Sequence, residues 1–276
     1  MKAAEMFKVE GYGAIVTGGA SGLGLAFTEV LAEHGARVTV FDLDQQRIDS
    51  EVQRLSALGY DVSGMRVDVT DRADMHDAFA QVHATYGRLD VVFANAGIDS
   101  GPGFVTLDRT QRVSEGAIEN YEDARWNKVI ETNLNSVFTT VKAAARYMKP
   151  QRSGRIIITT SAAALLIESG VGAAYMAAKA GVAHFMRTMA QELARYQVTV
   201  NAIAPGPFIT NIGGGHAFRP EVQEAFGATV PLGRMASTEE IKGLALLLAS
   251  PASSFITGAQ ISIDGGATLG QLFEQG

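Results

Sequence analysis

A tyrosine and a lysine, Tyr175 and Lys179, stand four residues apart in a stretch with helical periodicity. Side chains at this spacing share one helix face and can converge on one ligand. A free phenol has a pKa near ~10, and an ammonium about 4 Å away stabilises the phenolate by roughly 4 kcal/mol, or about 3 pKa units. The pair is therefore suited to exchanging a proton with a substrate near neutral pH. The plain alternative is a packed tyrosine followed by a solvated lysine.

A glycine-rich segment, Thr17 to Gly24, lies between a β-branched run and a helical stretch that reaches about His34. Its glycines let the backbone turn sharply and approach a pyrophosphate. The free N–H groups and the dipole of a helix N-terminus favour the negative charge of such a group. The segment predicts a dinucleotide-binding loop, against the alternative of an ordinary glycine-rich turn.

An acidic residue, Asp42, closes the next predicted strand, Arg37 to Phe41, at the distance from the glycine loop that a dinucleotide site requires. A carboxylate there accepts hydrogen bonds from the adenosine ribose and repels a 2′-phosphate. The glycine loop has no Arg or Lys to neutralise that phosphate, so NAD is favoured over NADP, although Arg47 on the next helix leaves NADP open. Alternatively, Asp42 caps the helix that begins near Gln45.

Seven short runs rich in β-branched residues alternate with longer amphipathic stretches, which predicts an α/β fold with a doubly wound parallel sheet of about seven strands. We expect one domain over residues 1–276, because this length suits a single sheet of that class. Ligands bind such sheets beyond the carboxyl ends of the strands, so the functional residues should follow the strands directly. The predicted strands are Ala14 to Thr17, Arg37 to Phe41, Val62 to Val67, Val91 to Ala94, Arg155 to Thr159, Val198 to Ile203 and Gln260 to Ile263.

Two long connections interrupt the alternation, over about residues 98–124 and 207–230. Long connections in compact domains are often functional, so we expect the first to border the active site and the second to cover the substrate. The apolar Leu165 to Ile167 indicate a partly hydrophobic pocket, whereas His216 and Arg219 in the second connection favour a carboxylate or sugar hydroxyls. The C-terminal tail, residues 268–276, has apolar side chains suited to packing on a neighbouring subunit.

The composition excludes several other classes of function. The net charge is -6 with no long basic run, which argues against nucleic acid and anionic membranes as partners. The absence of cysteine excludes thiolate metal sites, and the histidines show no shared metal-ligand spacing. We expect no metal site. No apolar run is long enough to span a membrane, and residues 1–10 lack the apolar core of a secretory signal, so a soluble cytoplasmic protein is expected.

Taken in order, these motifs resemble those of the classical short-chain dehydrogenase/reductase family. The shared pattern also includes Asp68-Val69, Asn95-Ala96-Gly97, a helical Asn133, Ser161 and Pro205-Gly206, and it extends from about Gly11 to Gly266. The resemblance implies a Rossmann-like fold, a nicotinamide cofactor and a homotetramer.

Within that resemblance, Ser161 is the group that hydrogen-bonds the substrate oxygen. It stands fourteen residues before Tyr175, where the family usually has thirteen, and we interpret this as a one-residue insertion in the following loop. Thr160 is the less favoured substitute, and Ser161 could also simply end the strand. The resemblance assigns Asn133, in a predicted helix from Trp126 to Met148, a local helix distortion and a water-mediated link to Lys179; a plain polar helix residue is the alternative.

The remaining cofactor contacts are implied by the resemblance alone. Asp68 and Val69 would flank the adenine, although Asp68 fits a helix cap equally well. The residues expected to bind the cofactor are Gly18, Ser21, Gly22, Leu23, Gly24, Asp42, Asp68, Val69, Asn95, Ala96, Gly97, Tyr175, Lys179, Pro205, Gly206 and Thr210.

The sequence thus predicts an NAD(H)-dependent enzyme that interconverts a secondary alcohol and a ketone, with Asn133, Ser161, Tyr175 and Lys179 as its catalytic residues. Two alternatives remain at this stage. One is a non-catalytic NAD-binding sensor or scaffold, which would have no need of a tuned phenol. The other keeps the fold but performs isomerisation or dehydration with tightly held NAD.

Overall fold

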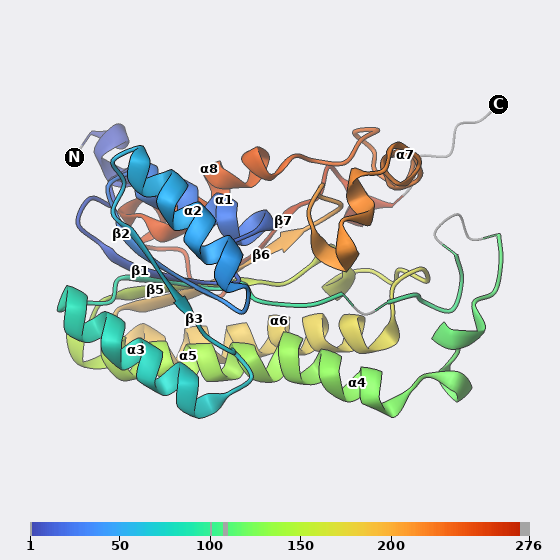
Figure 1. The fold of residues 1–276 in the computed structure, drawn as a ribbon, viewed down its shortest axis with the longest axis horizontal. Helices are drawn as coiled ribbons and strands as arrows, with labels where there is room; N and C mark the ends of the chain where they lie inside the picture. The colour runs from blue at the N-terminus through green and yellow to red at the C-terminus, as the bar shows by residue number, and fades with distance from the viewer. Residues whose placement is uncertain (1, 100, 107–109, 271–276) are drawn as a thin grey trace.

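Seven parallel strands form one sheet in the order β3-β2-β1-β4-β5-β6-β7, which confirms the predicted doubly wound architecture (Figure 1). The computed structural model describes residues 2–99, 101–106 and 110–270. The predicted strands agree with the observed ones to within two residues at every end. The observed strands are β1 (Gly13–Thr17), β2 (Arg37–Asp42), β3 (Val62–Arg66), β4 (Val91–Ala94), β5 (Gly154–Thr159), β6 (Val198–Pro205) and β7 (Gln260–Ile263).

Helices cover both faces of the sheet because its central strands are apolar on both sides. One face carries α1 (Gly22–Glu33), α2 (Gln45–Ala57) and α8 (Lys242–Ala249), and the other carries α3 (Arg72–Tyr86), α5 (Ser136–Gln151) and α6 (Ala173–Leu193) (Figure 1). In the first layer Phe27 stacks on Phe93 with ring centroids 4.5 Å apart, and in the second Phe41 meets Phe79 edge-on at 5.7 Å.

Aspartates fix where two of these helices begin. The Asp44 side chain accepts a hydrogen bond from the Arg47 amide at the start of α2, and the Asp71 side chain accepts from two amides at the start of α3. Both interpretations that used other residues as caps, Asp42 for α2 and Asp68 for α3, are therefore wrong. Those two carboxylates remain at the carboxyl edge of the sheet.

The predicted helix from Trp126 to Met148 is interrupted. It consists of α4 (Asp123–Ile130), a π-helical turn at Glu131–Asn135, and α5. Because π turns shift the register of a helix and occur at functional sites, the turn places Asn133 where a regular helix would not.

The two long connections meet the same region at the carboxyl end of the sheet. In the first, the Gly103 amide donates to the Gly170 carbonyl at 3.0 Å, and Pro102 forms a β-bridge with Val171. The second contains α7 (Pro220–Gly227). Leu269 is 89% exposed, and the tail residues 271–276 lie outside the described residues. Within the described part of the chain, none of the helices combines the length and apolarity that crossing a bilayer demands.

Candidate active site

The glycine loop between β1 and α1 has the backbone of a phosphate cradle. Gly18 and Gly22 adopt φ values of +63° and +54°, which favour glycine. A Cβ on Gly24 would stand 2.0 Å from the Gly18 carbonyl oxygen, so a side chain there would fill the loop. Ser21 precedes the first turn of α1 without capping it, and Thr210 lies across the loop from Gly22. The residues predicted to hold a pyrophosphate thus lie together and fit that group.

Asp42 lies beside the glycine loop at the end of β2. One carboxylate oxygen accepts from the Ala20 amide at 3.2 Å, and the other accepts from the Asp44 amide at the same distance. Arg47 is the cation that kept NADP possible as the cofactor in the sequence analysis. It forms an ion pair with Asp44 at 3.0 Å. The loop and the carboxylate therefore form one surface with a negative charge at the ribose end.

The segment after β3 is ordered by its own side chains. The Asp68 carboxylate accepts from the amide and the hydroxyl of Thr70, and the Asp68 amide donates to the Asp74 carboxylate. Val69 is 6% exposed. These contacts hold the pair at the edge predicted to flank the adenine, and that contact stays a prediction.

Thr17 at the end of β1 ties the glycine loop to the segment after β4, a role that sequence reasoning missed. Its hydroxyl oxygen accepts from the amides of Asn95 and Ala96 at 2.9 and 3.1 Å. The Asn95 amide nitrogen donates to the Thr17 carbonyl, and its side-chain oxygen accepts from the Thr159 hydroxyl at 3.0 Å. The only signal that the sequence offered was a threonine at the end of a predicted strand.

Tyr175 and Lys179 lie one turn apart on α6, next to the end of β5. The Lys179 ammonium is 5.5 Å from the centroid of the Tyr175 ring and donates to the Thr159 carbonyl at 2.8 Å. Lys179 is buried, whereas Tyr175 is partly exposed. The predicted convergence of the two side chains is therefore present.

Ser161 is hydrogen-bonded to the Tyr175 hydroxyl. Its own hydroxyl oxygen also accepts from the Ala163 amide at 3.1 Å, in a short 3₁₀ turn that follows β5. The alternative Thr160 donates instead to the Ile203 carbonyl at 2.9 Å and is buried in the sheet. The fourteen-residue spacing thus leaves Ser161, rather than Thr160, beside the phenol.

The protonation of this pair differs from the sequence expectation. Burial raises the pKa of Tyr175 to about 12, while the hydrogen bond from Ser161 lowers it and the charges of Glu168 and Asp99 raise it further. Burial lowers the pKa of Lys179 to about 8. The estimate from sequence gave the attraction of the ammonium before any loss of hydration, and desolvation is the largest effect on the pKa of both groups. The protein's own groups therefore do not lower the pKa of the Tyr175 phenol to a value near neutral pH.

Asn133 is fully buried in the π-helical turn, so it is not a plain polar helix residue. Its side-chain oxygen accepts from the Ile98 amide at 3.0 Å and its side-chain nitrogen donates to the Ile98 carbonyl at 2.9 Å. A Cβ on Gly97 would stand 2.5 Å from the Asn133 oxygen. Asn133 therefore anchors the segment after β4 on the helix layer. The local distortion that the resemblance implied is present, and the link to Lys179 stays a prediction.

Pro205 is the last residue of β6, and Gly206 follows it. The Gly206 amide donates to the Ile263 carbonyl at 3.0 Å, and a Cβ on Gly206 would stand 2.7 Å from Asp264. Only glycine fits this close approach, which keeps the chain beside the neighbouring strand. Thr210, further along, is 8% exposed and faces the glycine loop.

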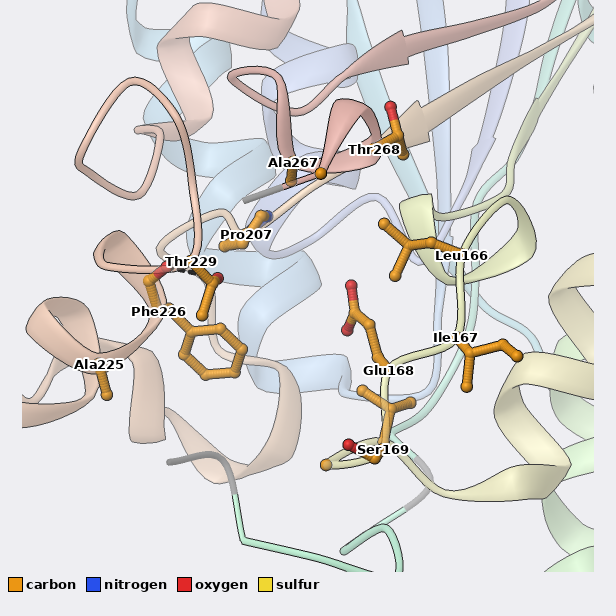
Figure 2. Close-up of a pocket in the computed structure, with 13 residues that line it drawn as sticks. Leu166, Ile167, Glu168, Ser169, Pro207, Ala225, Phe226, Thr229, Ala267 and Thr268 are labelled. Carbon is orange, nitrogen blue, oxygen red and sulfur yellow. Dashed lines mark hydrogen bonds between the residues drawn. The ribbon is translucent and has the colours of Figure 1, made fainter. Parts of the chain in front are cut away.

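A pocket of about 350 Å³ lies between the loop after β5 and the region of α7 (Figure 2). The residues that line it include none of Ser161, Tyr175 and Lys179. Leu166 and Ile167 line it, as the sequence predicted, and the second long connection contributes Pro207 and Phe226. Leu165 is not among the residues that line the pocket. Sequence reasoning missed Glu168, whose carboxylate points into the pocket (Figure 2). The structure does not describe the side chain of His216, and Arg219 stands exposed before α7.

The histidine rings whose contacts are described bind or pack on neighbouring groups of the protein, and exposed His76 contacts Asp77 and Arg146. The His34 ring hydrogen-bonds the Val30 carbonyl, and the His83 ring stacks on Tyr147. Among the residues that the structure describes, no cluster of three or more His, Asp or Glu side chains is arranged to hold a metal ion.

Comparison with known proteins finds oxidoreductases over nearly the whole chain. A family model described as enoyl-(acyl carrier protein) reductase matches residues 18–268. The 3-oxoacyl-[acyl-carrier-protein] reductase FabG of Thermotoga maritima is 33% identical over 95% of this chain and 100% of its own length. The trans-4-hydroxycyclohexanecarboxylate dehydrogenase of Sinomonas cyclohexanicum is 35% identical over 95% of each chain.

A solved structure of a dehydrogenase has the same fold. The gluconate 5-dehydrogenase from Burkholderia cenocepacia J2315, in complex with NADP and tartrate, superposes with a TM-score of 0.86 at 28% identity. The match covers 97% of this chain and 99% of that one.

Proposed function

This chain belongs to the short-chain dehydrogenase/reductase family, and we propose that it interconverts a secondary alcohol and a ketone with NAD(H), using Tyr175 as the general acid/base. The family binds a nicotinamide cofactor and performs oxidoreduction of this kind. The observation that carries the proposal is the phenol of Tyr175 hydrogen-bonded to Ser161 and flanked by the Lys179 ammonium, next to a glycine loop fit for a dinucleotide.

In alcohol oxidation, the Ser161 hydroxyl orients the substrate oxygen and the Tyr175 phenolate takes its proton. When bound, the nicotinamide supplies the acceptor for the hydride that leaves the carbinol carbon, and its positive charge favours the phenolate. The Lys179 ammonium, fixed by the Thr159 carbonyl, stabilises the phenolate. In ketone reduction the same groups act in reverse, and Tyr175 gives its proton to the oxygen.

Around this centre, the glycine loop would hold the pyrophosphate, and Asp42 the adenosine ribose. Asn95, Ala96 and Gly97 would pass beside the second ribose, anchored by Thr17 and Asn133. Pro205, Gly206 and Thr210 would hold the carboxamide side of the nicotinamide. The connections at residues 98–124 and 207–230 would enclose the substrate, since both reach the pocket region.

The direct test of the activity is a screen for NADH formation, read as absorbance at 340 nm, with secondary alcohols, polyols and hydroxy acids. We expect at least one class to be oxidised with NAD. Product formation without any net change in NADH would favour an isomerase or dehydratase instead.

Two features support NAD over NADP. The negative charge of the Asp42 carboxylate would repel the 2′-phosphate of NADP, and the Arg47 guanidinium is held in an ion pair with Asp44. The gluconate 5-dehydrogenase structure holds NADP, so the preference within this fold depends on such local charges.

Replacement of Asp42 by alanine is expected to lower kcat/KM with NAD by roughly 10- to 100-fold, because a hydrogen bond to a charged acceptor contributes about 1.5 to 3 kcal/mol. The value with NADP should stay the same or rise, because a repulsive charge is removed. Initial rates with both cofactors measure the ratio. Asp49→Ala removes the same charge from exposed α2 and should change neither rate. An unchanged NAD to NADP ratio in Asp42→Ala would refute the assignment.

We also propose that the chain works as a homotetramer in the cytoplasm. Large apolar side chains stand exposed around the edge strand β7, with Phe255 fully exposed and Leu269 nearly so. Light scattering of the purified protein measures the assembly, and a monomer would contradict this part of the proposal.

A further inference from the structure

Thr28 is a fully buried threonine on α1, and its side chain contacts the glycine loop. Its hydroxyl donates to the Gly19 carbonyl at 3.2 Å and to the Gly24 carbonyl at 3.1 Å, so one proton is shared between two acceptors. The bond to Gly24 spans four residues of one helix, which is usual for a helical threonine. The bond to Gly19 spans nine residues and leaves the helix. Thr28 therefore ties α1 to the loop that precedes it.

The Gly19 carbonyl is directed into the protein by this bond, because the hydroxyl that it meets is completely buried. The loop lies close against the threonine, since a Cβ on Gly19 would stand 3.0 Å from the Thr28 hydroxyl oxygen. The next amide, that of Ala20, donates to the Asp42 carboxylate. The glycine loop is thus held in shape by side chains from both α1 and β2.

The direction of the Gly19 carbonyl bears on the binding of a pyrophosphate. A pyrophosphate is attracted by main-chain N–H groups and repelled by carbonyl oxygens, which carry a negative partial charge. The peptide on either side of a glycine rotates more freely than at other residues. Without the Thr28 hydroxyl, the carbonyl would lose a donor inside the protein and would gain one by turning toward solvent. The exposed side of the loop is the side on which the pyrophosphate would bind.

We propose that Thr28 is a positioning residue for the cofactor. Its hydroxyl keeps the Gly19 carbonyl turned inward, so that the glycine loop presents N–H groups, and not this oxygen, to the pyrophosphate. The inference rests on the proposed function, in which the loop holds that group. Because Thr28 lies behind the loop and has no exposed surface, it acts on the affinity for the cofactor and not on the proton transfer at Tyr175.

Thr28→Val tests the proposal, because valine keeps the shape of the side chain and removes the hydroxyl. Fluorescence titration with NADH and with NADPH measures the affinity for either cofactor, and calorimetric titration with ADP-ribose measures it without the nicotinamide. We expect each ligand that the wild type binds to bind roughly 5- to 10-fold more weakly, as the loss of one neutral hydrogen bond implies. At saturating cofactor, kcat should not fall by more than about twofold, since no group at Tyr175 changes. Thr28→Ser keeps the hydroxyl and should restore the affinity to within about twofold of wild type.

Thr140→Val is the matched control. Thr140 is buried on α5, and its hydroxyl donates to the Ser136 carbonyl at 2.8 Å, a bond that stays within one helix. The same change there should leave the affinity for the cofactor unchanged. If Thr28→Val does not fold, the comparison of Thr28→Ala with Thr28→Ser isolates the same hydroxyl.

Full affinity in Thr28→Val, an equal loss in Thr140→Val, or a Thr28→Ser protein as weak as Thr28→Val would each overturn the proposal. So would a kcat that falls at saturating cofactor while the affinity is kept. Failure of the proposed function appears differently. A wild-type protein that binds NADH or NADPH but oxidises no alcohol lacks the proposed chemistry, and its affinities still test Thr28. A wild-type protein that binds neither cofactor would refute the dinucleotide site on which both depend.

Discussion

Replacement of Tyr175 by phenylalanine is expected to lower kcat by roughly 10²- to 10⁴-fold, which is the usual contribution of a positioned general acid/base. The change removes one hydroxyl and keeps the ring. Lys179 remains hydrogen-bonded to the Thr159 carbonyl, and Ser161 remains in its turn through Ala163. The fold and the dinucleotide site should therefore survive. Absorbance at 340 nm measures turnover, and calorimetric titration with NAD measures binding, which we expect to stay within about threefold.

Tyr147→Phe provides a matched control. Tyr147 lies on α5 and stacks on His83 of α3, a helix that carries none of the catalytic residues. The same loss of a phenolic hydroxyl there should leave kcat unchanged. Near-normal turnover in Tyr175→Phe, with the control also normal, would remove Tyr175 from the chemistry.

Replacement of Lys179 by methionine is expected to have opposite effects on activity and on stability. Activity should fall by roughly 10²-fold or more, because the phenolate loses the ammonium that stabilises it. The free energy of unfolding should stay equal or increase. The pKa of Lys179 is lowered to about 8 in the folded protein, so the native state binds this proton less tightly than the unfolded chain does. At neutral pH the buried ammonium therefore destabilises the fold, and this destabilisation falls as the pH rises from about 8, the folded pKa, to 10.5, the unfolded pKa.

Methionine has a similar length and no charge, so it should fill the space with little strain. Thermal unfolding at pH 7 and initial rates measure the two effects. Lys128→Met on the exposed face of α4 is the control and should alter neither. A Lys179→Met protein that is clearly less stable, or that keeps its turnover, would contradict this account of the pair.

Residues whose roles depend on their type and on their local spacing could be predicted from the sequence. The glycine loop, Asp42, and the Tyr175 and Lys179 pair depend on local geometry, in which a turn or a helix brings near neighbours together. The strand pattern likewise predicted the sheet, because fully buried parallel strands are short apolar runs between helices. The structure brings these groups to one edge.

Other residues could not be found, because their roles depend on distant contacts. Thr17 receives hydrogen bonds from residues 78 and 79 positions away, and Thr159 positions Lys179 through a main-chain carbonyl that any residue possesses. Glu168 lies in an irregular loop without periodicity. The π turn at Asn133 interrupts a stretch whose apolar pattern predicts one continuous helix, and only the family resemblance implied the distortion. The balance between charge and burial at the phenol also needs the packed structure.

The pH dependence of alcohol oxidation tests the Tyr175 and Lys179 pair most directly. Burial raises the pKa of Tyr175 to about 12 and lowers that of Lys179 to about 8, so the pair loses its first proton near pH 8, mainly from Lys179. The same one-proton state includes the form with a phenolate beside an ammonium, which the positive charge of bound nicotinamide favours. At saturating NAD, kcat/KM for the alcohol should rise roughly tenfold per pH unit below about pH 8 and then level off. In Lys179→Met the rise should continue toward pH 12. A flat profile from pH 6 to 9, or one that is the same in both proteins, would contradict a phenol tuned by this ammonium.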